Sequence, residues 1–289
     1  MGKITSCPAC TGESIEPGPR VREVELFRCG SCSLLWWDWE EFDPKAFYQE
    51  GFFRNVGVET GFDDYAQLET SMRKTSRSRL GRIERFVQPD ARNILDIGCG
   101  MGFFLDEVQS RGWKAAGIEI SEYAGLFARE RFNLEVSIGA FPLEVTTTGG
   151  PFDVVTLWDA IEHFKDPRAS LETVHGLLRL GGLCVLTTGD VSSLVARLSG
   201  SRWHLYSFPE HLFFYSPRSI RALLESVGFR VTALKYESAH YTLGYLLERL
   251  DKTLLGLGPR WRGFTAKLPG ASCIIPFNLF DIMTVYAFK

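Results

Sequence analysis

Four of the seven cysteines form two Cys-x-x-Cys pairs near the start of the chain, Cys7 with Cys10 and Cys29 with Cys32. Eighteen residues separate the two pairs, and thiolate pairs at such a spacing typically bind one tetrahedral zinc ion. Because sulfur fills all four positions, no ligand position stays open for a substrate, and the predicted role of the zinc is structural. Iron in the same cage and a reduced quartet without metal are the alternatives.

A second candidate site surrounds a glycine-rich turn. The segment ILDIGCGMGFF, residues 94–104, runs from an apolar strand through three glycines into a helix. Glycines let the backbone approach a ligand closely, and a helix N-terminus presents free N–H groups to it. Taken alone, the pattern fits a nicotinamide or flavin dinucleotide as well as another nucleoside.

Two details favour a positively charged nucleoside. The third glycine of a dinucleotide fingerprint would stand at position 103, but Gly102 comes one residue early and Phe103 takes that place. Asp96 ends the strand, where its charge would repel a pyrophosphate but attract an ammonium and a sulfonium. Glu119 ends the next strand, 21 residues after Gly98, where it can accept hydrogen bonds from ribose hydroxyls.

Short apolar strands alternate with helices from residue 93 onward, which indicates a parallel sheet with crossover helices. Strands are expected over 93–97, 114–118, 134–138, 152–157, 183–187, 230–236 and 282–288. Helices are expected over 102–111, 121–131, 167–179 and from Ser216-Pro217 to Gly228. The prediction is an α/β fold with a Rossmann-like, mostly parallel seven-stranded sheet and helices on both faces.

The chain is expected to divide into two units. Residues 1–40 are predicted to form a zinc-ribbon module, because they hold too little apolar material to fold without metal. Residues 41–289 form the main domain, in which 41–92 provide a connector and a helix over about 65–86. Residues 239–277 are an insert before the last strand.

Several ordered motifs resemble those of class I S-adenosylmethionine-dependent methyltransferases, bacterial members of which often carry an N-terminal ribbon. The motifs are LDIGCGxG at 95–102, GIEIS at 117–121, FDVVTLWDAIEH at 152–163 and LGGL at 180–183. The resemblance implies S-adenosylmethionine as cofactor, bound by the glycine turn, with the acid on the ribose and other residues flanking the adenine. It places cofactor contacts at Asp96, Gly98, Cys99, Gly100, Gly102, Glu119, Ile120, Ala140, Phe141 and Trp158. Tyr65 is a further candidate, expected to cover the methionine end.

Methyl transfer to a hydroxyl requires a group that takes its proton. Three candidates lie near the expected carboxyl edge of the sheet: His163, His211 and Asp190. A loop-bracing role for His163 and a core-packing role for His211 are the alternatives.

A run of basic side chains occupies the helix predicted before the glycine turn. A solvated basic face is expected, with one arginine on the cofactor's carboxylate as the alternative. The residues are Arg73, Lys74, Arg77, Arg79, Arg82 and Arg85.

Net charge, apolar content and cysteine placement limit the classes of function that the chain can have. The net charge of −3 gives no general reason to expect a nucleic-acid partner. No apolar stretch approaches the ~18 residues of a membrane span, and the N-terminus lacks the apolar core of a secretory signal. Dispersed cysteines indicate a reducing compartment, so a cytoplasmic enzyme is expected.

The leading hypothesis is a methyltransferase acting on a small-molecule hydroxyl, that of a sugar, glycan precursor or secondary metabolite. An RNA base methyltransferase with a zinc module and a catalytically inactive binding protein are the alternatives. The amphipathic segment around 245–257 is expected to pack against the sheet, with peripheral membrane contact as a less favoured hypothesis. The sequence predicts neither the acceptor nor the oligomeric state.

Overall fold

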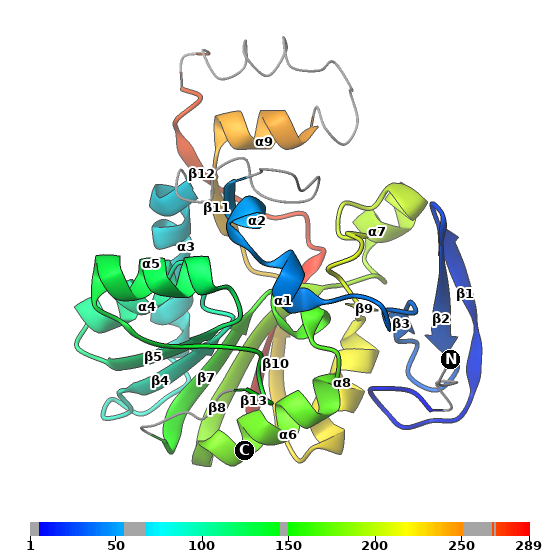
Figure 1. Cartoon of the computed structure of the whole chain (residues 1–289), viewed down its shortest axis with the longest axis horizontal. Coiled ribbons are helices and arrows are strands. Elements are labelled where there is room, and N and C mark those ends of the chain that lie inside the picture. Colours follow the sequence, from blue (N-terminus) through cyan, green and yellow to red (C-terminus); the bar gives the residue numbers. More distant parts are fainter. Residues whose placement is uncertain (1–5, 55–67, 145–149, 251–267, 269) are drawn as a thin grey trace.

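A seven-stranded sheet forms the centre of the computed structural model, which describes residues 6–54, 68–144, 150–250, 268 and 270–289 (Figure 1). The strand order is β10-β13-β8-β7-β4-β5-β6. The strands are β4 (Asn93–Ile97), β5 (Lys114–Glu119), β6 (Glu135–Ile138), β7 (Phe152–Trp158), β8 (Leu178–Gly189), β10 (Arg230–Lys235) and β13 (Ile282–Phe288). All neighbours pair in parallel except β13, which is antiparallel to both β8 and β10. The predicted Rossmann-like sheet is confirmed.

Helices cover both faces of this sheet (Figure 1). On one face lie α3 (Glu69–Ile83), α4 (Phe103–Ser110) and α5 (Glu122–Phe132), and on the other lie α6 (Pro167–Leu177) and α8 (Pro217–Ser226). Successive strand residues point to opposite faces, so Ile94 packs with the first group of helices and Leu95 with the second. Ser216 caps α8 as predicted.

The order of the strands places the switch point of the sheet between β4 and β7. These neighbours are parallel, and their following connections lead to opposite halves of the sheet. Ligands of open α/β sheets bind outside the carboxyl ends of strands at such a point. The glycine turn after β4 and the segment Asp159–His163 after β7 both lie at this edge, and the latter contains the short helix η2 (Ile161–His163).

The N-terminal ribbon is joined to the main domain by a shared sheet. Its strands β1 (Ile15–Val21), β2 (Val24–Cys29) and β3 (Leu35–Trp36) are followed in the sheet by β9 (Phe213–Phe214) of the main domain. Leu35 pairs with Phe214, and Trp36 with Phe213. Nothing in the sequence pattern predicted this pairing, because a two-residue strand carries no periodicity. Two short helices follow β3 along the chain: α1 (Pro44–Phe47) and α2 (Glu50–Arg54). Two others precede β9: α7 (Leu194–Ser199) and the 3-10 helix η3 (Gly200–Arg202).

The insert forms a small unit of its own. Strands β11 (Ala239–Thr242) and β12 (Ile274–Phe277) pair antiparallel, and α9 (Leu243–Leu250) follows β11. The backbone N–H of His240 donates to Thr75 Oγ1 of α3 at 2.8 Å. The expected packing of α9 against the seven-stranded sheet is wrong, because β11 and α3 hold the insert above the sheet edge (Figure 1). Residues 251–257 lie outside the described residues. Within the described ranges, every helix is too short or too polar to span a bilayer.

Candidate active site

Three glycines after β4 have left-handed backbone angles that only glycine adopts without strain. Their φ values are 77° at Gly98, 55° at Gly100 and 80° at Gly102. A Cβ on Gly102 would lie 2.7 Å from Leu134 Cδ1 and 2.9 Å from Ala128 Cβ, so this glycine also permits close packing of the helix start. The glycine-rich turn that the sequence predicted after β4 is therefore present, and its conformation requires glycine at these three positions.

Asp96 is buried beneath this turn, with 1% of its surface exposed. Its Oδ1 accepts a hydrogen bond of 2.6 Å from Thr156 Oγ1 on the neighbouring strand β7. Burial raises the pKa of Asp96 to about 7, while the Thr156 hydrogen bond and the charge of Arg79 lower it. At neutral pH the carboxyl is therefore poised to lose its proton when a cation binds beside it.

Glu119 is also buried and holds the glycine turn in place. Its Oε2 accepts the N–H of Gly100 at 2.7 Å, and its Oε1 accepts the N–H of Ser121 at 2.9 Å. Burial raises its pKa, and the two backbone donors oppose that rise. The Glu119 side chain thus links the turn after β4 to the end of β5. The sequence analysis expected only a ribose contact for Glu119 and did not predict this structural role.

Trp158 and Asp159 end β7 next to the turn. The Arg79 guanidinium lies 4.2 Å from the centre of the Trp158 ring and 3.5 Å from Asp159 Oδ2. Asp159 has a left-handed φ of 51°, which costs energy in a residue with a side chain. Trp158 Nε1 is buried and has no hydrogen-bond partner among the described residues. An unpaired donor and a strained residue at one strand end are typical of a ligand site.

The predicted solvated basic face is present only in part. Three of its residues are exposed and three are half-buried: Lys74, Arg77 and Arg85 are exposed, and Arg73, Arg79 and Arg82 are half-buried. Arg73 contacts Glu69, Asp106 and Glu107, and Arg77 also binds Glu107. Arg82 pairs with Glu237 at 3.2 Å, and Arg79 with Asp159. The acidic partners lie on other elements, except for Glu69, so the single helix could not reveal them. Carboxylates thus offset the charge of Arg73, Arg77, Arg79 and Arg82.

The remaining cofactor candidates are Cys99, Ile120, Ala140, Phe141 and Tyr65. Cys99 is 8% exposed, and burial raises its pKa, so it is not a nucleophile. Ile120 follows Glu119 and is half-buried. The half-buried Phe141 packs beside Phe164 with ring centres 6.0 Å apart, and the Ala140 N–H donates to Glu144. Tyr65 lies outside the described residues.

The two candidate histidines lie close together after β7 and before β9. The rings of His163 and His211 lie 4.8 Å apart at 75°. His163 Nδ1 lies 2.8 Å from both the Glu210 carbonyl oxygen and the Tyr48 hydroxyl, and His211 Nδ1 lies 2.8 Å from the Leu205 carbonyl oxygen. Since a carbonyl only accepts, each Nδ1 carries the proton, and each Nε2 keeps a lone pair.

Burial keeps both imidazoles neutral. It lowers the pKa of His163 and of His211 to about 4, and the mutual proximity of the rings contributes for His163. Glu162 is 4% exposed, and burial, with the nearby charge of Asp159, raises its pKa to about 8. One ligand atom each of Glu162, His163 and His211 lies within 4.8 Å of the others, so the cluster can relay a proton or hold one metal ion.

Asp190 lies at the end of β8 but is occupied by other groups. It is 2% exposed, its Oδ1 accepts the N–H and the hydroxyl of Ser192, and its Oδ2 accepts the Tyr236 hydroxyl at 2.5 Å. These bonds tie β8 to β10. The structure brings His163 and His211 together. Both carboxylate oxygens of Asp190, by contrast, already accept hydrogen bonds from Ser192 and Tyr236.

Several site residues were missed by the sequence analysis. Thr156 points from β7 to Asp96, and Glu162 precedes His163 in the quoted motif, so position alone was a signal for both. Tyr48 and Glu210 reach His163 from distant segments, and no local pattern marks them.

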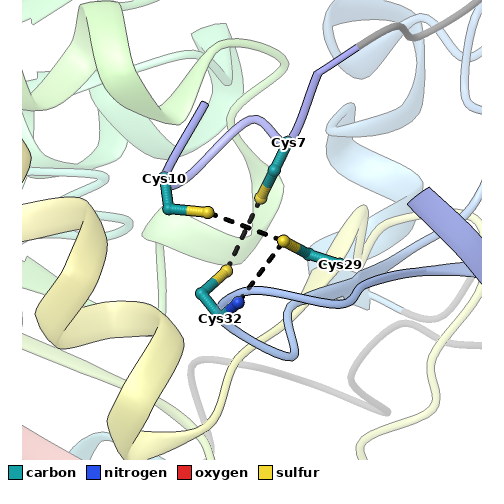
Figure 2. Close-up of side chains that lie close together, drawn as sticks. All are labelled: Cys7, Cys10, Cys29 and Cys32. Atoms are coloured by element: carbon teal, nitrogen blue, oxygen red, sulfur yellow. Dashed lines mark hydrogen bonds between the residues drawn. The ribbon is translucent and has the colours of Figure 1, made fainter. Parts of the chain in front are cut away.

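The four cysteines of the ribbon converge on one point (Figure 2). Cys7 and Cys32 have sulfurs 3.6 Å apart, and those of Cys10 and Cys29 are 3.5 Å apart. A tetrahedral ion with zinc–sulfur bonds of about 2.3 Å requires sulfurs about 3.8 Å apart, so the donor set fits zinc. Backbone N–H groups of Ala9 and Cys32 point at Cys7 Sγ and Cys29 Sγ at 3.4 Å each.

The ribbon also contacts the histidine cluster. Trp37 Nε1 donates to the carbonyl oxygen of His211 at 2.8 Å, and Arg168 of α6 donates to the Ala9 carbonyl at 2.7 Å. Cys7, Cys29 and Cys32 belong to the same buried cluster as side chains of α6 and α8. The ribbon is therefore a wall of the main domain.

The seven-stranded sheet, with the glycine turn at its switch point, is the fold of Rossmann-like methyltransferases that use S-adenosylmethionine. A family profile described as a methyltransferase domain matches residues 70–234, and the chain belongs to that family.

Curated relatives and solved structures agree with this membership. The chain is 24% identical over 236 residues to a ubiquinone biosynthesis O-methyltransferase of Bordetella bronchiseptica, covering 77% of this chain and 87% of that protein. It is 36% identical over 105 residues to the enzyme of the same name from Psychrobacter cryohalolentis, covering 34% and 40%.

Two solved structures share the fold. Magnesium protoporphyrin IX methyltransferase of Synechocystis PCC 6803, with bound S-adenosylhomocysteine, has a TM-score of 0.51 at 14% identity, covering 86% of this chain and 97% of that one. A SAM-dependent methyltransferase of Archaeoglobus fulgidus has a TM-score of 0.50 at 19% identity, covering 78% and 99%.

Proposed function

We propose that this methyltransferase binds S-adenosylmethionine over its glycine turn and methylates a hydroxyl of a small-molecule acceptor held against His163 and His211. The observation that carries the proposal is the pair of neutral imidazoles whose Nε2 atoms keep their lone pairs at the carboxyl edge of β7. A hydroxyl needs such a proton acceptor, because its proton must leave as the new bond to carbon forms.

The donor half of the site fits the cofactor. Asp96 and Glu119 place two carboxyls beside a turn that has left-handed glycines, and Trp158 Nε1 has no hydrogen-bond partner among the described residues. When bound, S-adenosylmethionine supplies an electrophilic methyl group on a sulfonium. Asp96 then attracts the positive charge, and Glu119 accepts hydrogen bonds from the ribose.

His163 is the proposed base. Its Nε2 takes the acceptor proton, while Nδ1–H stays fixed on the Glu210 carbonyl, which keeps the ring oriented. Nearby charges of Glu210 and Asp159 favour the imidazolium that forms. His211 packs against the ring and positions it. The remaining task of the protein is alignment of the acceptor, which contributes up to about 7–11 kcal/mol.

The proposed acceptor is a hydroxyl of a sugar, a glycan precursor or a secondary metabolite. The names of the curated relatives specify transfer to oxygen, which supports a hydroxyl acceptor. Aromatic side chains of the segment 203–215 adjoin the histidines: Phe214 lies 6.5 Å from His211 between ring centres. A wall of this kind suits a partly apolar small molecule.

The test starts with a panel of nucleotide sugars, free sugars and phenols, incubated with enzyme and S-adenosylmethionine and assayed for one added methyl group by mass. With an acceptor in hand, His163→Gln should lower kcat by about 10²–10⁴-fold without weakening cofactor binding, because only the proton acceptor is lost. His175→Gln on α6, where the ring packs on Phe229, is the matched control.

Full activity of His163→Gln would refute the assignment. Turnover that disappears with a chelator, while the ribbon keeps its metal, would instead make Glu162, His163 and His211 metal ligands.

The cysteine cluster is proposed to hold one structural zinc ion. Purified protein should contain one zinc per chain by mass spectrometry of the metal, and Cys29→Ser should lose it and melt at a lower temperature. Cys273→Ser, at an exposed cysteine far from the cluster in sequence, should keep it. Stoichiometric iron, or a metal-free wild-type protein that melts unchanged after zinc is added, would contradict the proposal.

A further inference from the structure

A groove separate from the glycine turn lies between the ribbon and the main domain. Its volume is about 720 Å³, within the range of small-molecule sites. The ribbon contributes Pro17–Pro19, Arg28 and Leu35, and the main domain contributes residues after β8 and the start of α8. The groove exists only because β3 pairs with β9, which brings these two parts of the chain together.

Three arginines line this groove: Arg28 on β2, Arg197 on α7 and Arg218 in the first turn of α8. None of the three has an ion-pair partner in the described part of the chain, and no described acidic residue lines the groove. On α3, by contrast, Arg73 and Arg77 are matched by carboxylates. Three like charges around one hollow repel each other and favour an anion between them.

Other lining groups suit a phosphorylated molecule. Arg218 lies at the N-terminal, positive end of the ten-residue helix α8. Ser33 offers a hydroxyl from the ribbon, and the buried Tyr206 and Leu35 provide an apolar wall. Guanidinium groups bind phosphate through paired hydrogen bonds, so several of them around one groove are typical of phosphate and diphosphate recognition.

We propose that this arginine groove, defined by Arg28, Arg197 and Arg218, binds a small molecule that carries a phosphate or diphosphate group. A single groove of about 720 Å³ has the size of a small-molecule site, whereas an RNA would need basic side chains along an extended surface. The net charge of −3 also opposes a polyanion.

The groove shares a wall with the proposed acceptor site. Tyr206 packs on Trp203 and Phe214, with ring centres 5.2 Å and 4.9 Å apart. Trp203 and Phe214 in turn line a cavity of about 10 Å³ beside Glu162 and His211. A ligand in the groove is therefore one aromatic layer away from the histidine cluster. The proposal stands whether that ligand is the acceptor itself or a second molecule.

Calorimetry on the full zinc-loaded chain tests the groove with inorganic pyrophosphate, UDP and uridine at physiological salt. Pyrophosphate and UDP should bind and uridine should not, since it lacks the anion. Arg28→Gln and Arg218→Gln should each weaken UDP binding roughly 10–100-fold, the loss expected for one charged hydrogen-bond pair. Arg202→Gln, at an exposed arginine outside the groove, should leave it unchanged, and S-adenosylmethionine binding should stay intact in all three variants.

Three outcomes would overturn the proposal. They are no binding of pyrophosphate or UDP at millimolar concentration, equal binding by the Arg28→Gln and Arg218→Gln variants, and tighter binding of a single-stranded RNA than of UDP with the same arginine dependence. Methylation of a phosphorylated acceptor that weakens in parallel with UDP binding in these variants would identify the ligand as the acceptor. Unchanged methylation would identify a second ligand. Failure of the histidine test leaves this binding experiment unaffected.

Discussion

The two halves of the proposed active site are built in opposite ways. The donor half, with Asp96, the glycine turn and Glu119, comes from residues 94–121 of one βαβ unit. The acceptor half joins Tyr48, Glu162-His163 and the segment 205–211, which are far apart in the chain. In the proposed site, the cofactor contacts therefore come from one local unit, whereas the acceptor contacts come from separate segments that can change independently.

The two halves also differ in electrostatics. The donor half keeps a carboxyl whose pKa is about 7, ready to ionise against a cation. The acceptor half is held neutral, with imidazoles of pKa about 4 and a carboxyl of pKa about 8. Substitutions that affect one half and spare the other therefore test whether the two are independent.

Asp96→Asn should give the largest effect on the donor half. We expect S-adenosylmethionine to bind about 10–100-fold more weakly at pH 8, the loss typical of one charge-assisted interaction. The wild-type affinity should rise as the pH rises through about 7, because binding requires the ionised carboxylate. The variant should lose that pH dependence. Calorimetry between pH 6 and 8.5 measures both.

Asp90→Asn, in an exposed turn, is the control for this substitution. An unaltered affinity of Asp96→Asn, or a pH dependence that survives it, would place the cation elsewhere and break the donor side of the comparison.

Glu162→Gln should act on the acceptor half through stability. The folded-state pKa of Glu162 is about 8, above its ordinary 4.5. Wild-type stability is therefore lost progressively as the pH rises between these values, whereas an amide does not titrate. The difference in melting temperature between the variant and the wild type should therefore be about 2–4 °C larger, in favour of the variant, at pH 8 than at pH 5. This shift corresponds to a free-energy difference of about 1 kcal/mol.

Scanning fluorimetry at the two pH values measures this difference, and binding of S-adenosylmethionine should not change. The same melting difference at pH 5 and pH 8 would show that Glu162 does not titrate in this range and that the acceptor half is not held neutral.

Thr156→Val should give the smallest effect and sharpen the donor side. Its hydroxyl donates to Asp96 Oδ1 at 2.6 Å and lowers the pKa of that carboxyl. Without it, the midpoint of the affinity–pH curve should move up by about 0.5–1 unit, the equivalent of one neutral hydrogen bond. Affinity at pH 8.5 should stay within about twofold.

The matched control is Thr173→Val, whose hydroxyl bonds only to the Ala169 carbonyl within α6. A midpoint that moves down, or moves equally in the control, would mean that Thr156 does not set the Asp96 pKa.

Local elements were predictable because their signals are contained in a few consecutive residues. Strand β4 has the predicted bounds of 93–97, and α8 begins at Pro217 as the Ser216-Pro217 pair indicated. The ion pairs of the arginines on α3 were not predicted, for the converse reason: a carboxylate such as Glu107 lies on another helix, and the pattern of a single helix does not reveal it.

By itself the sequence determined the βα unit around Asp96, the parallel sheet and the grouping of Cys7, Cys10, Cys29 and Cys32. The backbone angles of glycine, the alternation of apolar residues in strands and the spacing of the cysteines each depend on residues within one turn or strand. The local sequence therefore specifies these features. Only the tertiary structure decided that the ribbon completes a sheet with β9, that Tyr48 reaches His163, and that unpaired arginines share one groove. Those contacts depend on burial of apolar surface between distant segments, which no single segment specifies.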